Sequence, residues 1–187
     1  RYMFDSCSKL KSIDLSSFNT INVTDMANMF RRCSSLTSLE FGDNFDTSKV
    51  TTMTNLFIEC SSLKSVKFGE KFKTSNVTKM NNMFKDCTSL TAVDLSKFDT
   101  SNVTDMSYMF SDSAIKELDL SNFDTSKVTT MQGMFRNTGS LKSIEFSDKF
   151  NAVQVTDMLH MFTNSAVEEL DLRSFDTQNL TNIDQMF

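Results

Sequence analysis

The stretch FDTSNVTDMSYMF (residues 98–110) recurs with small changes throughout the chain, at intervals of 25 to 27 residues. A repeat of this length that fills a chain is typical of proteins in which each unit packs on its neighbours. We therefore predict one domain over residues 1–187, built from about seven repeats, and expect it to be an internal segment of a longer array. Each repeat closes on a Met-Phe or Leu-Phe pair, at Phe4, Phe30, Phe57, Phe84, Phe110, Phe135, Phe162 and Phe187.

The apolar residues within one repeat follow two different spacings. Val93 and Leu95 alternate with polar residues, which predicts a short strand with one buried face. Met106, Met109 and Phe110 are spaced i, i+3, i+4, which predicts a short helix that begins at an N-cap threonine, Thr104. The sequence therefore predicts an α/β repeat solenoid, leucine-rich-repeat-like, with one short strand and one short helix per repeat. Successive strands would pair in a parallel sheet about 4.8 Å apart.

The composition argues against several classes of function. The chain has 24 acidic and 19 basic residues, a net charge of −5, and the charges are interspersed, which disfavours nucleic acid as a partner. No apolar run approaches the roughly 20 residues that span a bilayer. The four glycines form no glycine-rich loop that could bind a phosphate. Because His160 is the only histidine, no histidine-based catalytic site can be assembled around it. We therefore predict a protein that is not an enzyme, needs no cofactor and does not insert this segment into a membrane.

Sulfur-containing side chains also follow the repeat. Each cysteine lies three residues after a repeat-closing phenylalanine, and the same column continues as Ser113, Thr138 and Ser165. Hydroxyl replacements and wide spacing argue against disulfides and zinc, and favour a stack of small, half-buried side chains; an exposed redox or cross-linking role is the alternative. Methionine thioethers could bind copper(I), but their spacing favours packing. The cysteines are Cys7, Cys33, Cys60 and Cys87.

Two threonine columns run along the array. Thr100 represents the first column, to which we assign hydrogen bonding within the bend, and Thr104 represents the second, to which we assign helix capping. Regular threonine rows could instead template ice. The sequence Asn102-Val103-Thr104 has the form of a glycosylation acceptor of eukaryotic secreted proteins, and the alternative is that its asparagine is only a turn residue and its threonine a helix cap.

The outward positions of the strands carry the most informative charges. Six of the seven middle residues are acidic, and Lys67 is the exception. One interpretation is a solvated face that blocks aggregation, and the other is a shallow acidic surface for a basic protein segment or, weakly, for Ca²⁺. The residues that we predict to bind a partner are Ser12, Asp14, Glu40, Asp94, Asp119, Glu145 and Asp171.

The repeated motif also resembles a known family. DTSNVTDMSYMF (99–110) and DTSKVTTMQGMF (124–135) resemble the repeats of BspA-like leucine-rich-repeat proteins, and more closely a family of unknown function found in mycoplasma lipoproteins and in surface proteins of lactobacilli. This resemblance implies a non-catalytic protein at the extracellular or bacterial cell surface. It implies adhesion to an extracellular protein or glycan, and the alternative is a purely structural stalk or spacer.

Overall fold

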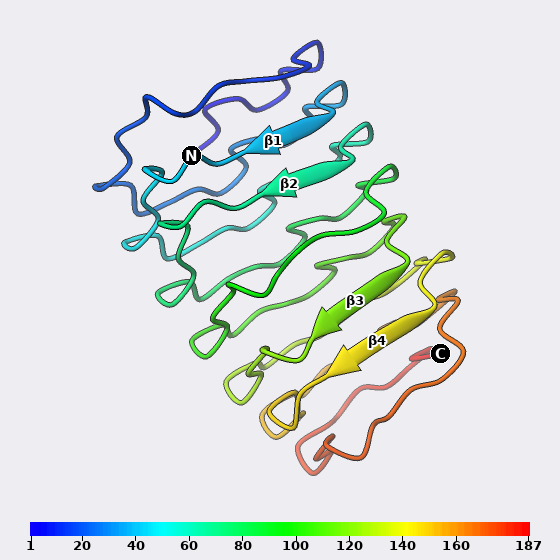
Figure 1. The fold of residues 1–187 in the computed structure, drawn as a ribbon. Coiled ribbons are helices and arrows are strands. Elements are labelled where there is room, and N and C mark those ends of the chain that lie inside the picture. Colours follow the sequence, from blue (N-terminus) through cyan, green and yellow to red (C-terminus); the bar gives the residue numbers. More distant parts are fainter.

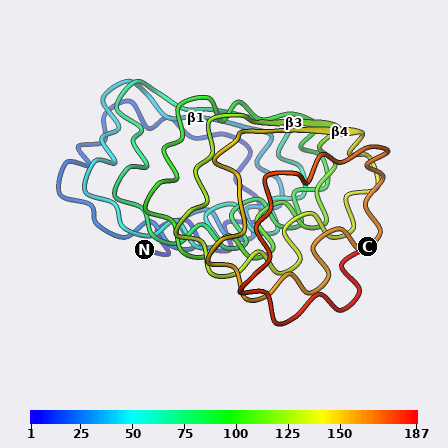
Figure 2. The same ribbon diagram turned by 90° about the horizontal axis from the view of Figure 1, so that it is seen from below.

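The computed structural model describes the whole chain, residues 1–187, as a stack of successive repeats (Figure 1). Four short strands lie on one face of the stack. β1 (Ser38–Glu40) pairs in parallel with β2 (Ser65–Lys67), and β3 (Glu117–Leu120) pairs in parallel with β4 (Ser143–Phe146). The two chain termini lie at opposite ends of the stack, both on the side away from the strands (Figure 2).

The predicted α/β solenoid is wrong. The structure contains no helix, its strands form two separate two-stranded sheets, and most of the chain is turns and irregular segments. The predicted parallel pairing of neighbouring repeats holds only within these two sheets. A second parallel ladder of single bridges joins the repeats on the other side of the stack. It runs through Asp25, Thr52, Lys79, Asp105, Thr130, Asp157 and Asn182.

Consecutive β-turns occupy the segment that was predicted to be helical. Met109 N–H donates to the Met106 carbonyl at 3.2 Å, and Ser113 N–H donates to the Phe110 carbonyl at 3.3 Å. The third residue of each turn has a positive φ, 55° at Tyr108 and 59° at Asp112, which is the pattern of type II turns. We call the segment from the first methionine of a repeat to the cysteine column the turn ribbon (residues 26–33, 53–60, 80–87, 106–113, 131–138 and 158–165).

Hydrogen bonding between repeats explains why the ribbon is not a helix. The N–H groups of Met106, Tyr108 and Phe110 donate to carbonyl oxygens of the next repeat at 3.3, 2.8 and 3.0 Å. A helix would direct these same donors back along its own chain. Asparagine tolerates the left-handed conformation better than most residues, and it supplies many of the positive-φ positions. These asparagines are Asn28, Asn55, Asn82, Asn137 and Asn164.

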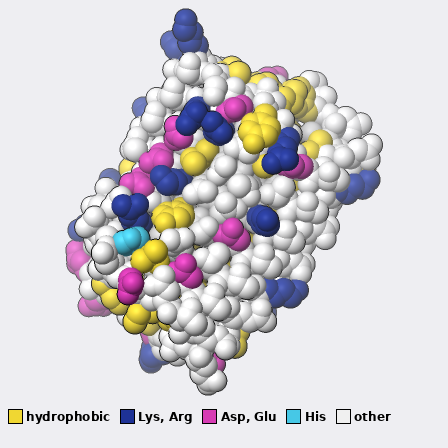
Figure 3. All heavy atoms as spheres, turned by 180° about the vertical axis from the view of Figure 1, so that it is seen from behind, with side chains coloured by type: hydrophobic (Ala, Val, Ile, Leu, Met, Phe, Trp, Pro, Cys, Tyr) yellow, Lys and Arg dark blue, Asp and Glu magenta, His cyan; other side chains and the backbone are white.

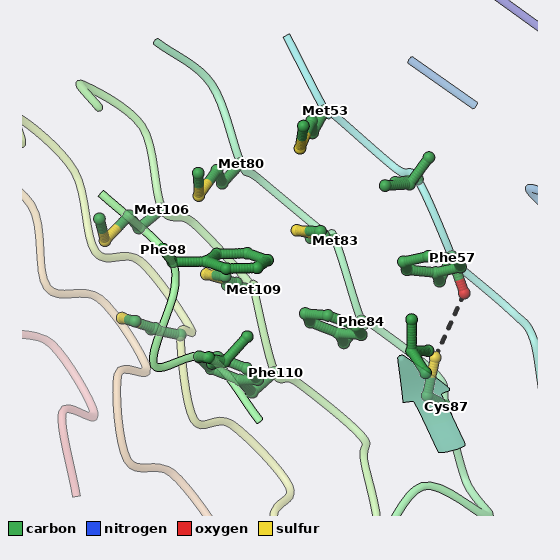
Figure 4. Close-up of a cluster of buried hydrophobic side chains, with 14 of the residues drawn as sticks. Met53, Phe57, Met80, Met83, Phe84, Cys87, Phe98, Met106, Met109 and Phe110 are labelled. Carbon is green, nitrogen blue, oxygen red and sulfur yellow. Dashed lines mark hydrogen bonds between the residues drawn. The ribbon is translucent and has the colours of Figure 1, made fainter. Parts of the chain in front are cut away.

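One hydrophobic core runs between the strand face and the turn ribbon. It contains 45 buried residues and extends through the interior repeats without a break. The repeat-closing phenylalanines stack in a column, with ring centroids 5.5 Å apart for Phe57 and Phe84 and 5.8 Å apart for Phe84 and Phe110 (Figure 4). Met80 and Met83 are buried beside them, which confirms that the methionines are packing residues.

The two threonine columns have different roles. Thr100 is buried, and its hydroxyl donates to the Asp124 carbonyl at 2.9 Å while accepting the Asp124 N–H at 2.8 Å. This column therefore links neighbouring repeats and presents no hydroxyl row to ice. Thr104 caps no helix, because its N–H and hydroxyl both donate to the Thr78 carbonyl of the preceding repeat, at 2.8 and 3.1 Å. Both columns stabilise the stacking of repeats.

Candidate functional site

The predicted partner-binding residues lie on the strand face. The paired strands place Asp119 directly opposite Glu145, and Glu40 directly opposite Lys67. In each of the two sheets the middle positions of neighbouring repeats therefore lie side by side, and we call the middle positions of all repeats the strand-face column. All of the predicted site residues are exposed: Ser12, Asp14, Glu40, Asp94, Asp119, Glu145 and Asp171.

Basic side chains neutralise part of this column. Lys67 Nζ lies 2.6 Å from Glu40 Oε1, so the two charges cancel on neighbouring strands. Near the other end, Arg173 Nε donates to Asp171 Oδ1 at 2.9 Å. Asp94, Asp119 and Glu145 form no ion pair in the chain, and we call these three residues the acidic triplet.

The aspartates of the column also shape the backbone. Asp94 Oδ1 accepts the N–H of Ser96 at 2.9 Å, and Asp119 Oδ1 accepts the N–H of Ser121 at 2.9 Å. Hydrogen bonds from the hydroxyl and the N–H of each serine lower the pKa of the two aspartates, because they favour the charged carboxylate. These Asx turns explain why aspartate recurs here, a role that the Asp-Leu-Ser pattern could have indicated from the sequence.

The strand face is shallow. A hollow of about 230 Å³ lies beside Phe68, Asp94 and Lys97, and a larger one of about 520 Å³ lies beside Phe146 and Arg173. Nowhere in the chain do three or more His, Cys, Asp or Glu side chains converge in a way that could hold a metal ion. The Ca²⁺ alternative therefore lacks a ligand cluster, and the surface suits an extended partner better than a small substrate.

The opposite face has a different chemical character. It carries scattered charges of both signs among neutral polar side chains (Figure 3). A groove of about 540 Å³ lies there, and its lining is rich in threonine and asparagine, including Asn28, Thr52 and Thr78. His160 is a half-buried turn residue with φ of 60° on this side. This groove offers hydrogen bonds but no charge cluster.

Comparison with known proteins identifies the repeat. A family model described as "Mycoplasma protein of unknown function, DUF285" matches residues 1–65, 39–145, 62–169 and 112–187. The chain belongs to the DUF285 family. The resemblance predicted from the repeated motif is therefore confirmed, and DUF285 membership brings no activity, ligand or site residue with it.

Other comparisons add little to the DUF285 assignment. No curated protein matches the chain. A solved structure of a leucine-rich repeat protein from Bacteroides ovatus ATCC 8483 is similar over 94% of this chain and 70% of that one, with 12% sequence identity and a TM-score of 0.29. The structure contains no helix long and apolar enough to cross a membrane.

The cysteine column of this DUF285 chain is structural over most of its length. Cys33, Cys60 and Cys87 are buried, and the thiol of Cys87 donates to the Phe57 carbonyl at 3.2 Å (Figure 4). All four cysteines are free thiols, and Cys7 alone is exposed. Burial raises the pKa of Cys33 to about 11 and that of Cys60 to about 12.

Thiol labelling of the native protein should therefore reach one of the four cysteines. The thiolate is the reactive form, and at pH 8 the raised pKa values keep Cys33 and Cys60 protonated as well as shielded. We expect a disulfide reagent to react rapidly with Cys7 alone, and with all four thiols after unfolding in guanidinium. Cys7→Ser should abolish the rapid phase, whereas rapid reaction at a second native thiol would contradict the buried ladder.

Proposed function

We propose that this DUF285 chain is a non-catalytic binding module of the extracellular or bacterial cell surface, whose strand face captures an extended basic segment of a protein partner. The observation that supports the proposal is the acidic triplet. Asp119 and Glu145 face each other on paired strands, and Asp94 contributes an unfavourable charge interaction to Asp119 from the preceding repeat. Three exposed carboxylates that form no ion pair, with Lys97 near Asp94 already paired to Glu70, fit a partner that supplies cations.

The spacing of the triplet favours an extended partner. Neighbouring parallel strands are about 4.8 Å apart, so successive carboxylates can each meet a basic side chain of a segment that runs across the repeats. Each exposed ion pair contributes about 0–1 kcal/mol, so the affinity rests on several pairs together and weakens with salt. Relief of the repulsion within the triplet adds to the gain on binding.

A lysine- and arginine-rich peptide in an extended conformation provides the test. We would measure its binding by fluorescence anisotropy at low salt, to the wild type and to a triple variant with Asp94→Asn, Asp119→Asn and Glu145→Gln. Asparagine keeps the oxygen that accepts the Ser96 and Ser121 N–H groups, so the variant loses charge but not its turns. We expect binding to weaken about tenfold or more, with an unchanged melting temperature.

A charge-matched control separates the triplet from net charge. Glu59→Gln, Asp86→Asn and Asp157→Asn remove the same charge outside the column and away from Lys97, and they should leave binding within about twofold. Because hydrogen bonds lower the pKa of Asp94 and Asp119, wild-type binding should persist as the pH falls toward 4. Equal losses in the two triple variants, or none in the first, would refute a strand-face site.

Two other outcomes point to different functions. A glycan that binds equally well to the triple variant would place recognition elsewhere, and the threonine- and asparagine-lined groove is where we would look for it. A structural spacer predicts no saturable ligand in screens of extracellular proteins and glycans. The regular bonding of each repeat to the next is compatible with that role as well.

A further inference from the structure

The backbone ladder of the strand face is interrupted in the interior of the stack. β1 pairs with β2, but the repeat that follows β2 contains no strand (Figure 1). Across the paired junction, Phe41 N–H donates to the Lys67 carbonyl at 2.9 Å. One repeat later, the equivalent groups are the Phe68 N–H and the Asp94 carbonyl, and neither makes a hydrogen bond in the chain. The strand face is therefore open between β2 and the next repeat.

The turn that follows β2 packs closely on the preceding repeat. A Cβ atom at Gly69 would lie 2.5 Å from the Phe41 carbonyl oxygen and 2.6 Å from the Gly42 carbonyl oxygen, so this approach requires glycine. The same turn, FGEKF (68–72), is one residue longer than its counterpart LSKF (95–98) in the following repeat. The opening therefore coincides with the point where a long repeat meets a shorter one.

An apolar slot lies at the opening. It is the hollow of about 230 Å³ on the strand face, and we call it the β2 slot. Phe68 is 9% exposed there, whereas its equivalent at the paired junction, Phe41, is 1% exposed. Two of the lining residues belong to the hydrophobic core, so the slot gives a partner access to apolar surface that strand pairing covers elsewhere. The lining residues are Val66, Lys67, Phe68, Asp94 and Lys97.

The charges around the β2 slot leave one carboxylate unpaired. Lys67 Nζ lies 2.6 Å from Glu40 Oε1, and Lys97 Nζ lies 2.6 Å from Glu70 Oε1, so both lysines of the lining are already paired. Asp94 forms no ion pair and is the first member of the acidic triplet. The slot therefore adjoins one end of the triplet and combines an apolar floor with a carboxylate at its rim.

We propose that the β2 slot holds one aliphatic side chain of the partner, at the end of the basic run that pairs with the acidic triplet. The inference rests on the proposed capture of an extended basic segment, and it adds a sequence requirement to that segment. Its occupant is a leucine-like residue directly next to the basic residues. One slot of this size accepts a single side chain, so the other end of the run carries no such requirement.

The register of an extended chain makes this requirement specific. Every second residue of such a chain points to the same side, about 6.6 Å further along. At about 4.8 Å per repeat, Asp119 and Glu145 lie about 7 and 12 Å from the centre of the slot. An aliphatic residue at position i in the slot therefore brings basic residues at i+2 and i+4 to Asp119 and Glu145, and a long basic side chain at i+1 reaches Asp94 at the rim.

Peptides with four consecutive basic residues test the requirement. Leucine is placed directly before the run in one peptide and directly after it in a second, and each has a counterpart with glycine in place of leucine. In fluorescence anisotropy at low salt, one of the two leucine peptides should bind about tenfold more tightly than its glycine counterpart. Only one order gains, because the slot adjoins one end of the triplet. Leucine moved one residue further from the run points away and should lose the gain.

Two variants of the protein locate the leucine. Val66→Met extends a flexible side chain into the slot and should remove the gain, with the affinity for the glycine peptide unchanged. Val93→Met makes the same change at the equivalent position of the next repeat, which does not line the slot, and should keep the gain. Melting temperatures would show that both variants fold. Independently of the variants, the Val66 methyl resonances of the wild type should shift more with the leucine peptide than with the glycine peptide.

The outcomes separate this inference from the proposed function. If the glycine peptides bind but neither leucine peptide gains affinity, the slot holds no side chain of the partner, and the capture of basic segments stands without it. A gain that survives in Val66→Met would also overturn the slot. Failure of all of the peptides to bind the wild type would instead refute the proposed function, and this inference with it.

Discussion

Phe84→Ala should be strongly destabilising, with an expected loss of about 3–5 kcal/mol in the free energy of unfolding. Phe84 is fully buried, and its ring stacks between Phe57 and Phe110 at 5.5 and 5.8 Å. Truncation leaves a cavity in the middle of a rigid column and removes contacts in three successive repeats at once. Urea denaturation followed by circular dichroism would measure the loss.

Phe187→Ala is the matched control, because it makes the same chemical change at a position that is 72% exposed. We expect a cost below about 1 kcal/mol, since little apolar surface is lost from the interior. Similar losses in the free energy of unfolding at the two positions would mean that packing in the phenylalanine column contributes little to the stability of the fold.

The aromatic column was readable from the sequence because the repeat-closing phenylalanines recur at a nearly constant interval. The turn ribbon was not readable in the same way: the sequence predicted a helix where the structure has turns, although the same residues are involved. Met106, Met109 and Phe110 point into one core in the structure, as the i, i+3, i+4 spacing indicated, but successive type II turns produce that spacing as well. Hydrophobic periodicity reports which side chains share a face, and it does not distinguish hydrogen bonds within a repeat from those between repeats.

A sequence signal for the turn ribbon was present in the asparagines. Asn28, Asn55 and Asn82 all lie two residues after the first methionine of their repeats, where the structure needs a positive φ. Asparagine is unremarkable in a turn and unfavourable in the middle of a helix, so its recurrence at this position in three successive repeats argues against a helix. That argument needs the alignment of the repeats with one another rather than the inspection of one repeat.

The strand face was predicted more successfully than the strands. Alternation alone indicates which side chains point outward, and all of the predicted site residues are exposed. What the sequence could not supply is the local charge balance. Glu40 is paired with Lys67 and Asp171 with Arg173, so the unpaired acidic residues of the column are Asp14, alone in the first repeat, and the consecutive Asp94, Asp119 and Glu145. These pairings depend on side-chain reach and conformation, which the spacing of the repeats does not give.

Thr100→Val should cost about 2–4 kcal/mol although the side chain keeps its shape. The Thr100 hydroxyl satisfies both the N–H and the carbonyl of Asp124, at 2.8 and 2.9 Å, inside a column that is shielded from water. Valine fills the same space and leaves both backbone groups without a partner, and each unsatisfied buried group costs about 1–3 kcal/mol. The free energy of unfolding from urea titration is the measurement.

Two further variants isolate the hydrogen bond from packing. Thr100→Ser retains the hydroxyl and loses one methyl group, so its cost should stay near 1 kcal/mol, well below that of the valine variant. Ala152 occupies the equivalent position two repeats later, and the Asp176 N–H and carbonyl opposite it have no hydrogen-bond partner in the chain. Ala152→Thr should therefore stabilise the protein by about 1 kcal/mol, because it completes the column at the one interior repeat where the hydroxyl is missing. If serine were as costly as valine, the methyl group would contribute as much as the hydroxyl, which would contradict a dominant role for the hydroxyl in holding successive repeats together at this position.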